Sequence, residues 1–205
     1  MKRVWLSVVA VVVMGVAAWA QAPGAPQFSA DMSASGPRDR GMKGKMYMGG
    51  GKMRMDMSTG EGKMSMITDP AKKTSYMVMH DQQMYMEMST DAPMGGMMGR
   101  GPRMPDVKAA GDNPCAGSQG VTCKLVGTET VNGRSCDKWE FVSSNKSEAG
   151  TMWIDQKTRW PIKSVKSDGS IMEFTNFKEG AQDASLFMPP AGYQKFDMGA
   201  MRGRQ

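Results

Sequence analysis

The residues of this chain that could do chemistry are mostly thioethers. Methionine occurs 25 times in 205 residues, and it takes every second position on both sides of a Gly-Glu-Gly turn in "KMRMDMSTGEGKMSM" (52–66). Thioethers at i and i+2 of a strand share one face. There they can ligate Cu(I) or Ag(I), pack adaptably on varied apolar ligands or consume oxidants by forming sulfoxide. The plainer alternative is that methionine replaces leucine and valine as the core residue of a sheet.

Groups for acid–base or nucleophilic catalysis are few. His80 is the only histidine. Because it follows Met79, on a regular strand it points away from the methionine set, and we interpret it as a surface histidine at a strand end. The sequence has no Gly-x-Ser-x-Gly, Walker or dinucleotide motif, and its carboxylates are scattered. It therefore predicts no enzyme, no cofactor and no resident metal.

Short strands are the elements that would position the methionines. From Phe28 to Met88 the residues alternate with period two, and turn signals separate the runs at 49–51, 58–62, 69–73 and 81–83. This pattern is typical of an antiparallel meander with one apolar and one polar face. The apolar face is the candidate ligand-binding wall: Met46, Met48, Met53, Met55, Met57, Met64, Met66, Met77, Met79, Met84, Met86 and Met88. The alternative metal site would use four of them, Met53, Met55, Met77 and Met79.

The remainder of the chain continues as strands after an interruption. Residues 89–114 are rich in Gly, Pro and Met without a period, and we expect a mobile loop there. Asn132-Gly133 then predicts a hairpin with a type I′ turn. The runs "TMWID", "WPIKSVK" and "SIMEFTNF" predict further strands, and "DASLFMPPAGYQKFDM" a short helical turn with an extended apolar segment. We expect this last element and the 89–114 loop to be lids over the methionine wall.

The amino-terminal segment has the pattern of a secretory signal. A charged start, an apolar core and Ala18-Trp19-Ala20 predict a signal peptide over residues 1–20, cleaved before Gln21. An uncleaved membrane anchor is the alternative. After the signal we expect a flexible linker (21–27), one domain (28–198) and a disordered tail (199–205), in the periplasm or outside the cell.

Three cysteines in an exported chain allow one disulfide and one free thiol. The predicted two-residue turn sets Cys123 opposite Val142, which places Cys123 and Cys136 about 20 Å apart along the hairpin. A disulfide tolerates Cα separations of only about 7 Å. Cys115–Cys123 and Cys115–Cys136 remain, and we favour the first because "PCAGSQGVTC" is a short flexible loop.

The net charge and its distribution along the sequence limit which partners the protein is expected to bind. The formal net charge is +6, and the basic excess lies largely between Arg38 and Lys63. We interpret it as a solvated outer face, opposite the methionines, with weak contact to an anionic membrane surface as the alternative. No aromatic residues interleave with basic ones in the manner of nucleic-acid binders, so no nucleic acid is expected. We expect a monomer whose partner is a hydrophobic small molecule or lipid.

Motifs of the carboxyl-terminal third carry a family resemblance. They read "GTETVNGRSCDKW", "MWIDQKTRWPIKS", "MEFTNF" and "DASLFMPPAGY", and the amino-terminal strands end in "YMEM". Over roughly residues 28–198 this order resembles the outer-membrane lipoprotein carrier superfamily, and most closely an exported domain-of-unknown-function family, DUF4412. The resemblance implies a mainly β half-barrel, an open and curved antiparallel sheet with short helical elements. Its concave apolar face would hold an acyl chain or lipid.

Overall fold

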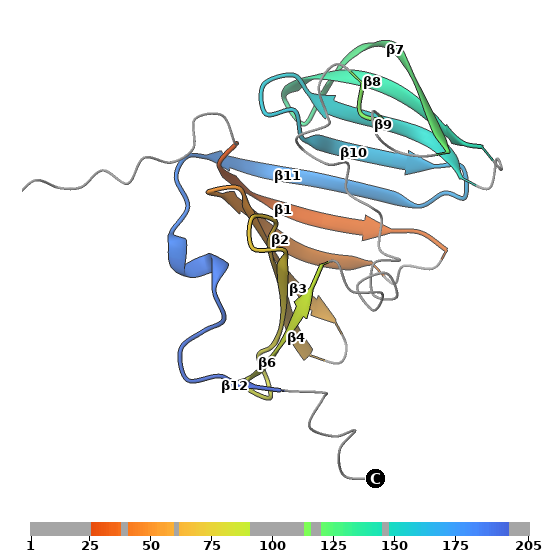
Figure 1. Ribbon diagram of the computed structural model, residues 1–205. Coiled ribbons are helices and arrows are strands. Elements are labelled where there is room, and N and C mark those ends of the chain that lie inside the picture. The colour runs from red at the N-terminus through yellow and green to blue at the C-terminus, as the bar shows by residue number, and fades with distance from the viewer. Residues whose placement is uncertain are drawn as a thin grey trace, which may run out of the picture.

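Twelve strands form one strongly curved sheet in this computed structural model, which describes residues 26–37, 41–59, 62–90, 113–115, 120–144 and 148–196. The strand order is β12-β6-β5-β4-β3-β2-β1-β11-β10-β9-β8-β7, and every neighbouring pair is antiparallel except β12 with β6 (Figure 1). The strands are β1 Phe28–Ser35, β2 Met42–Gly49, β3 Lys52–Thr59, β4 Gly62–Asp69, β5 Thr74–Met79, β6 Met84–Ser89, β7 Val121–Val131, β8 Arg134–Ser143, β9 Ala149–Asp155, β10 Pro161–Lys166, β11 Ile171–Glu179 and β12 Gln194–Lys195. One 3-10 turn, η1 (Ala184–Phe187), precedes β12.

The sheet consists of two meanders joined side by side. Strands β1 to β6 pair in chain order, as do β7 to β11, and β1 joins the two groups by pairing with β11. At this junction Phe28 lies opposite Glu179, and Met32 opposite Phe174. The predicted open, curved antiparallel sheet is confirmed.

The β7–β8 hairpin turns as its sequence predicts. Asn132 and Gly133 have φ angles of 51° and 75°, and positive values at both central positions define the type I′ turn. The predicted partner of Cys123 is wrong by one position, because Cys123 lies opposite Phe141 and not Val142. The register shifts between Leu125 and Gly127, where β7 carries one extra residue as a β-bulge.

Aromatic side chains fill the junction of the two meanders. Trp160, from the β9–β10 connection, is 1% exposed and packs edge-on against Phe28 (ring centroids 5.9 Å apart) and Phe174 (6.1 Å). Met32, Met46 and Met48 join the same buried cluster. The half-barrel is therefore packed solid where β1, β2 and β11 meet.

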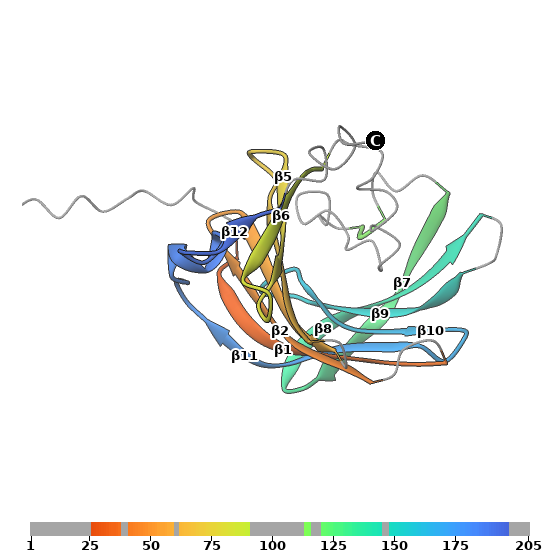
Figure 2. The ribbon, with the colours of Figure 1, turned by 90° about the horizontal axis from the view of Figure 1, so that it is seen from below.

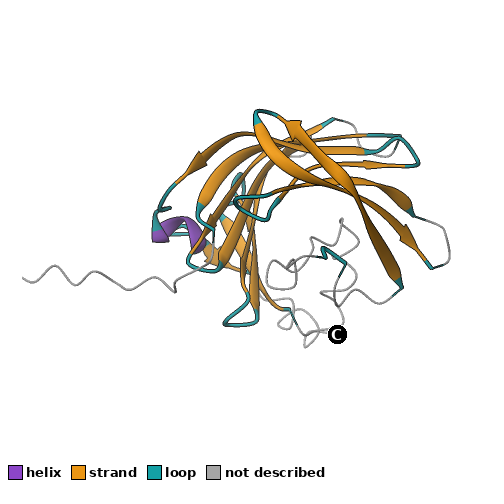
Figure 3. Ribbon diagram, turned by 90° about the horizontal axis from the view of Figure 1, so that it is seen from above, coloured by secondary structure: helices purple, strands orange, loops and turns teal. Residues whose placement is uncertain are grey.

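The carboxyl-terminal segment crosses the outside of the sheet. Residues 183–196, which we call the outer strap, contain η1 and β12 and lie on the convex side of β3–β6 (Figures 2 and 3). Asp183 caps η1 by accepting a hydrogen bond from the Ser185 amide. The ring of Phe187, 4% exposed, packs against Ile67 and Val78, which are fully buried.

The position of the strap shows that two expectations about the two faces of the first meander are wrong. Ile67 and Val78 alternate with the methionines and therefore lie on the opposite face. The carboxyl-terminal element thus covers the outer face and is not a lid over the methionine wall. The outer face is also not solvated throughout, since the side chain of Arg54, on that face of β3, is only 12% exposed.

Several expected segments fall outside the described residues. These are the signal peptide (1–20), most of the linker (21–25), the interior of the 89–114 loop (91–112) and the tail (199–205). Among the residues that are described, no helix is long and apolar enough to cross a membrane.

Candidate ligand-binding face

The predicted methionines form continuous rows across five strands. Directly paired residues point to the same face of a sheet, and β2 to β6 pair so that methionine meets methionine eight times, twice in each of four ladders. One row runs Met46–Met55–Met66–Met77–Met86, and a second runs Met57–Met64–Met79–Met84. We call this surface the methionine face. It is the face turned away from the outer strap and therefore the concave one (Figure 2).

The methionine face is uncharged and only partly covered. Its other paired positions between β2 and β6 include Gly44, Gly62, Thr68 and Ser75, besides further methionines. Met46 and Met48 are buried in the aromatic cluster, whereas the ten predicted methionines of β3 to β6 are each partly exposed. A flexible thioether surface of this kind can adapt to apolar groups of varied shape.

The apolar surface extends beyond the predicted set. A further row continues from Met42 over the second meander to the far edge of the sheet: Met42, Ala34, Met172, Ser164, Met152, Trp139 and Leu125. Sequence reasoning missed Met152 and Met172 because each stands alone in its strand, with no neighbouring methionine at i+2. Met42 could have been found, since it continues the period of Met46 and Met48 across Gly44.

The four methionines of the alternative metal site are not brought together as one cluster. Met53 and Met55 lie on β3 and Met77 and Met79 on β5, with β4 between them. The two groups are thus about two strand spacings apart, roughly 10 Å. Neighbouring strands instead unite Met55 and Met57 with Met66 and Met64, which are their direct partners.

The predicted disulfide is present and anchors the chain to the concave side. Cys115 and Cys123 are bonded, with their Cα atoms 5.7 Å apart, and Cys136 is a free buried thiol, as predicted. Cys123 lies two residues before Leu125, ahead of the bulge, and so shares the face of the apolar row that ends there. Cys115 is therefore bonded to a residue on the same side as the methionine face.

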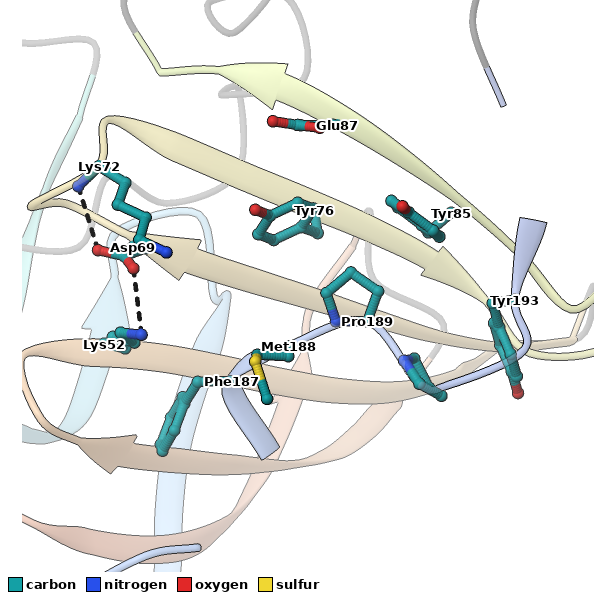
Figure 4. Close-up of a pocket in the computed structure, with 11 residues that line it drawn as sticks. Lys52, Asp69, Lys72, Tyr76, Tyr85, Glu87, Phe187, Met188, Pro189 and Tyr193 are labelled. Atoms are coloured by element: carbon teal, nitrogen blue, oxygen red, sulfur yellow. Dashed lines mark hydrogen bonds and ion pairs between the residues drawn. The ribbon is translucent and has the colours of Figure 1, made fainter. Parts of the chain in front are cut away.

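A separate groove lies on the outer face, beneath the strap (Figure 4). It has a volume of about 380 Å³. The rings of Tyr76 and Tyr85 meet edge to face on its strand side, with centroids 6.1 Å apart. Two ion pairs involve its lining, since Lys52 lies 3.2 Å from Asp69 and Glu87 binds Lys195. The full lining is Lys52, Asp69, Lys72, Tyr76, Tyr85, Glu87, Phe187, Met188, Pro189, Pro190 and Tyr193.

A polar network beside this groove includes the single histidine. His80 is partly exposed, with Nε2 2.7 Å from Ser65 Oγ and Nδ1 3.1 Å from the Tyr193 hydroxyl of the strap. Ser65 donates its hydroxyl proton to Asp56 over 2.6 Å, so Nε2–H of His80 donates to Ser65. Ser65 is fully buried and cannot reach a substrate. The serine–histidine pair is therefore a structural link to the strap and not a nucleophile. His80 lies just after β5 and away from the methionine face, as predicted, and it also contacts the strap through Tyr193.

The buried carboxylate of Asp155, in the second meander, also has structural partners. Asp155, whose side chain is 3% exposed, accepts two hydrogen bonds from Arg134 (3.1 and 2.9 Å) and two from Thr158. Burial raises the pKa of the Asp155 carboxyl, but these hydrogen bonds outweigh it and the net pKa is lowered. Burial raises the pKa of the Cys136 thiol, which disfavours the reactive thiolate.

These features define an open, curved antiparallel β-sheet with an uncharged methionine face between β2 and β6. The chain belongs to the DUF4412 family, described as a domain of unknown function, whose profile matches residues 29–158. No functionally curated protein matches the chain.

Solved structures are similar to this chain at low sequence identity. An uncharacterized conserved protein from Thermus thermophilus superposes with a TM-score of 0.56 at 10% identity, over 84% of this chain and 90% of that one. MucB superposes with a TM-score of 0.56 at 14% identity, over 82% of this chain and 59% of MucB, so this chain spans little more than half of that protein. MucB has also been solved in the MucA/MucB complex of Pseudomonas aeruginosa. A LolA superfamily protein from Nitrosomonas europaea gives a TM-score of 0.36 at 8% identity, over 80% of this chain and 90% of that one.

Proposed function

We propose that this protein is exported and binds the acyl chain of a lipid, or a similar apolar molecule, on its methionine face without catalysing a reaction. The observation that carries the proposal is the register of β2 to β6, which gathers eight Met–Met pairs on one concave face. None of the paired positions described on that face is charged. The signal-like start of the sequence supports export to the periplasm or the cell exterior.

The partial exposure of the methionines favours a bound ligand over a plain core. Removing a methionine side chain from water is worth about 1.5–3 kcal/mol, and the ten methionines of β3 to β6 are each only partly covered. The strap cannot cover them, since it is bound to the opposite face. An apolar guest on the concave side would gain this burial energy, and the unbranched side chains would adapt to its shape.

Paired substitutions in the wall test the proposal. Met55→Lys with Met77→Lys places two ammonium groups in the longest methionine row, and we expect uptake of a fluorescent fatty acid to be abolished. Met55→Leu with Met77→Leu is the matched control, because it keeps the wall apolar at similar volume, and its uptake should stay within about twofold. Circular dichroism checks that both variants fold. If the wild-type protein takes up neither fatty acid nor an apolar dye, the proposal is wrong.

A second candidate function is binding of Cu(I) or Ag(I). The adjacency of Met55, Met57, Met64 and Met66 on two paired strands favours it, because soft ions select thioether ligands. A variant with all four of these methionines replaced by leucine separates the two functions, since it removes the thioethers while keeping an apolar wall. Loss of stoichiometric Cu(I) binding in that variant, together with no lipid uptake by the wild type, would favour the metal.

A further inference from the structure

Strand β7 is a long outer edge of the sheet. It contains eleven residues and ends the strand order, and no other described strand pairs with its outer side. Residues 124–130 are all exposed, including Leu125 at 51% and Val126 at 40%. Alternate N–H and C=O groups of such an edge point away from the sheet and are available for pairing with another strand.

The opposite edge is built differently. It ends in β12, a strand of only two residues, whose Lys195 is paired with Glu87. Very short edge strands hinder pairing between sheets. Of the two edges that the structure describes, β7 is thus the one suited to receive another strand.

The bulge in β7 gives this edge a self-complementary charge pattern. Lys124 and Glu129 are the only charged residues of the strand. They are five positions apart, so in a regular strand their side chains would lie on opposite faces. The extra residue of the bulge changes this. Lys124 pairs with Glu140, and Glu129 pairs with Cys136. Glu140 and Cys136 are four positions apart on β8 and therefore share a face. Both charges of β7 therefore lie on one face.

A two-fold axis through the edge would match these charges. With the axis between Val126 and Gly127, Lys124 lies opposite Glu129 of the second copy, and Glu129 opposite Lys124 of that copy. In the same register Leu125 lies opposite Thr128. Opposite charges in directly paired positions stabilise a sheet, and like charges destabilise it.

Glu129 is held in place for such a contact. Lys138 Nζ and Trp153 Nε1 both donate to its Oε2 over 3.0 Å, and the side chain remains 48% exposed. Little side-chain freedom would therefore be lost when a second lysine approaches.

We propose that β7 pairs antiparallel with β7 of a second copy of this chain, in the register that joins Lys124 to Glu129, so that two half-barrels share one sheet. This interface is independent of the ligand function proposed above. It lies at the edge of the sheet, and the methionine rows of β2 to β6 are remote from it in the strand order.

Charge exchange tests the register, with sedimentation velocity of the full mature chain as the measurement. Lys124→Glu and Glu129→Lys each create two like-charge contacts, and we expect the dimer dissociation constant to rise about tenfold or more, which corresponds to about 1.4 kcal/mol. The double variant restores both attractive contacts and should dimerise like the wild type. An equimolar mixture of the two single variants should form a heterodimer, because in that pair every contact is again attractive.

Lys166→Glu is the control, since it reverses a charge paired with Glu148 (3.6 Å) that is not on β7, and it should leave dimerisation unchanged. A wild-type protein that stays monomeric at about 100 μM, a concentration well above a micromolar dissociation constant, would overturn the proposal. So would single variants that dimerise normally, or a mixture that forms no heterodimer.

Discussion

Arg54 Nη1 donates to the main-chain oxygen of Leu186 over 3.0 Å, and so ties the third strand of the sheet to the outer strap. The same guanidinium donates to Asp56 (2.6 Å) and to Ser65 (3.1 Å). One partly buried cation thus satisfies a carboxylate, a hydroxyl and a backbone carbonyl beneath the strap. Arginine suits this position because its planar group presents several donors in fixed directions.

Replacing this anchor should loosen the strap. Arg54→Ala leaves Asp56, Ser65 and the Leu186 carbonyl each without this donor, and we expect the free energy of unfolding to fall by roughly 2–3 kcal/mol. Urea denaturation measures the loss. Lys43→Ala, at an exposed position on β2, is the control and should change stability by about 0.5 kcal/mol or less.

Hydrogen exchange separates release of the strap from general destabilisation. The Gln194 and Phe196 amides bond to the carbonyls of Gln83 and Tyr85, so they report whether the strap is docked. In Arg54→Ala these two amides should exchange faster relative to those of the β7–β8 hairpin. Uniform acceleration across both regions would contradict the assigned role.

Asp155 should make the free energy of unfolding depend on pH. Its folded-state pKa is lowered, since the hydrogen bonds from Arg134 and Thr158 outweigh the effect of burial. The stabilisation is therefore fully present above the ordinary aspartate pKa of about 3.9 and is lost as pH falls through the folded-state value. Asp155→Asn should cost roughly 3 kcal/mol at pH 7, and the difference from wild type should shrink towards pH 3.

Urea denaturation at pH 7, 5 and 3 measures this difference. Glu148→Gln, which removes a carboxylate that is 63% exposed, is the control and should show little change at any of the three. A penalty for Asp155→Asn that stays constant down to pH 3 would mean that Asp155 stabilises the fold by shape and not by charge.

The predicted signal peptide defines where the mature chain should begin. The signal pattern that ends at Ala18-Trp19-Ala20 predicts that the mature chain begins at Gln21. Intact-mass spectrometry of the protein recovered from a bacterial periplasm would show this terminus. Ala20→Phe, which removes a small residue at the cleavage site, should leave the precursor uncut. A wild-type chain that keeps Met1 would refute cleavage.

Local sequence patterns predicted those parts of the fold in which neighbouring strands pair. The alternation of methionines fixed their common face, and Asn132-Gly133 fixed the hairpin turn. Both signals act over a few residues, where turn chemistry and period two determine the geometry. The cysteine pairing followed from the same turn and survived the one-residue error in register.

Contacts between distant segments were not predictable in the same way. Ile67 and Val78 alternate with methionine and so make both faces of β4 and β5 apolar, a pattern typical of strands covered on both sides. That signal could have shown that the outer face is covered, but not that the covering segment is the strap. The bulge beside Gly127 did have a local signal, because an isolated glycine inside a strand often marks a bulge.

The pairing of β1 with β11 also bears on how the chain reaches its native state. These two strands lie near opposite ends of the described sequence, yet together they form the middle of the sheet. Contacts between such distant segments raise the contact order of the fold, and a high contact order makes folding slow. If the chain is exported amino-terminus first, as proposed above, it cannot complete its sheet until β11 has emerged. Its first meander, with one apolar face, would until then need protection from aggregation by the machinery that receives it.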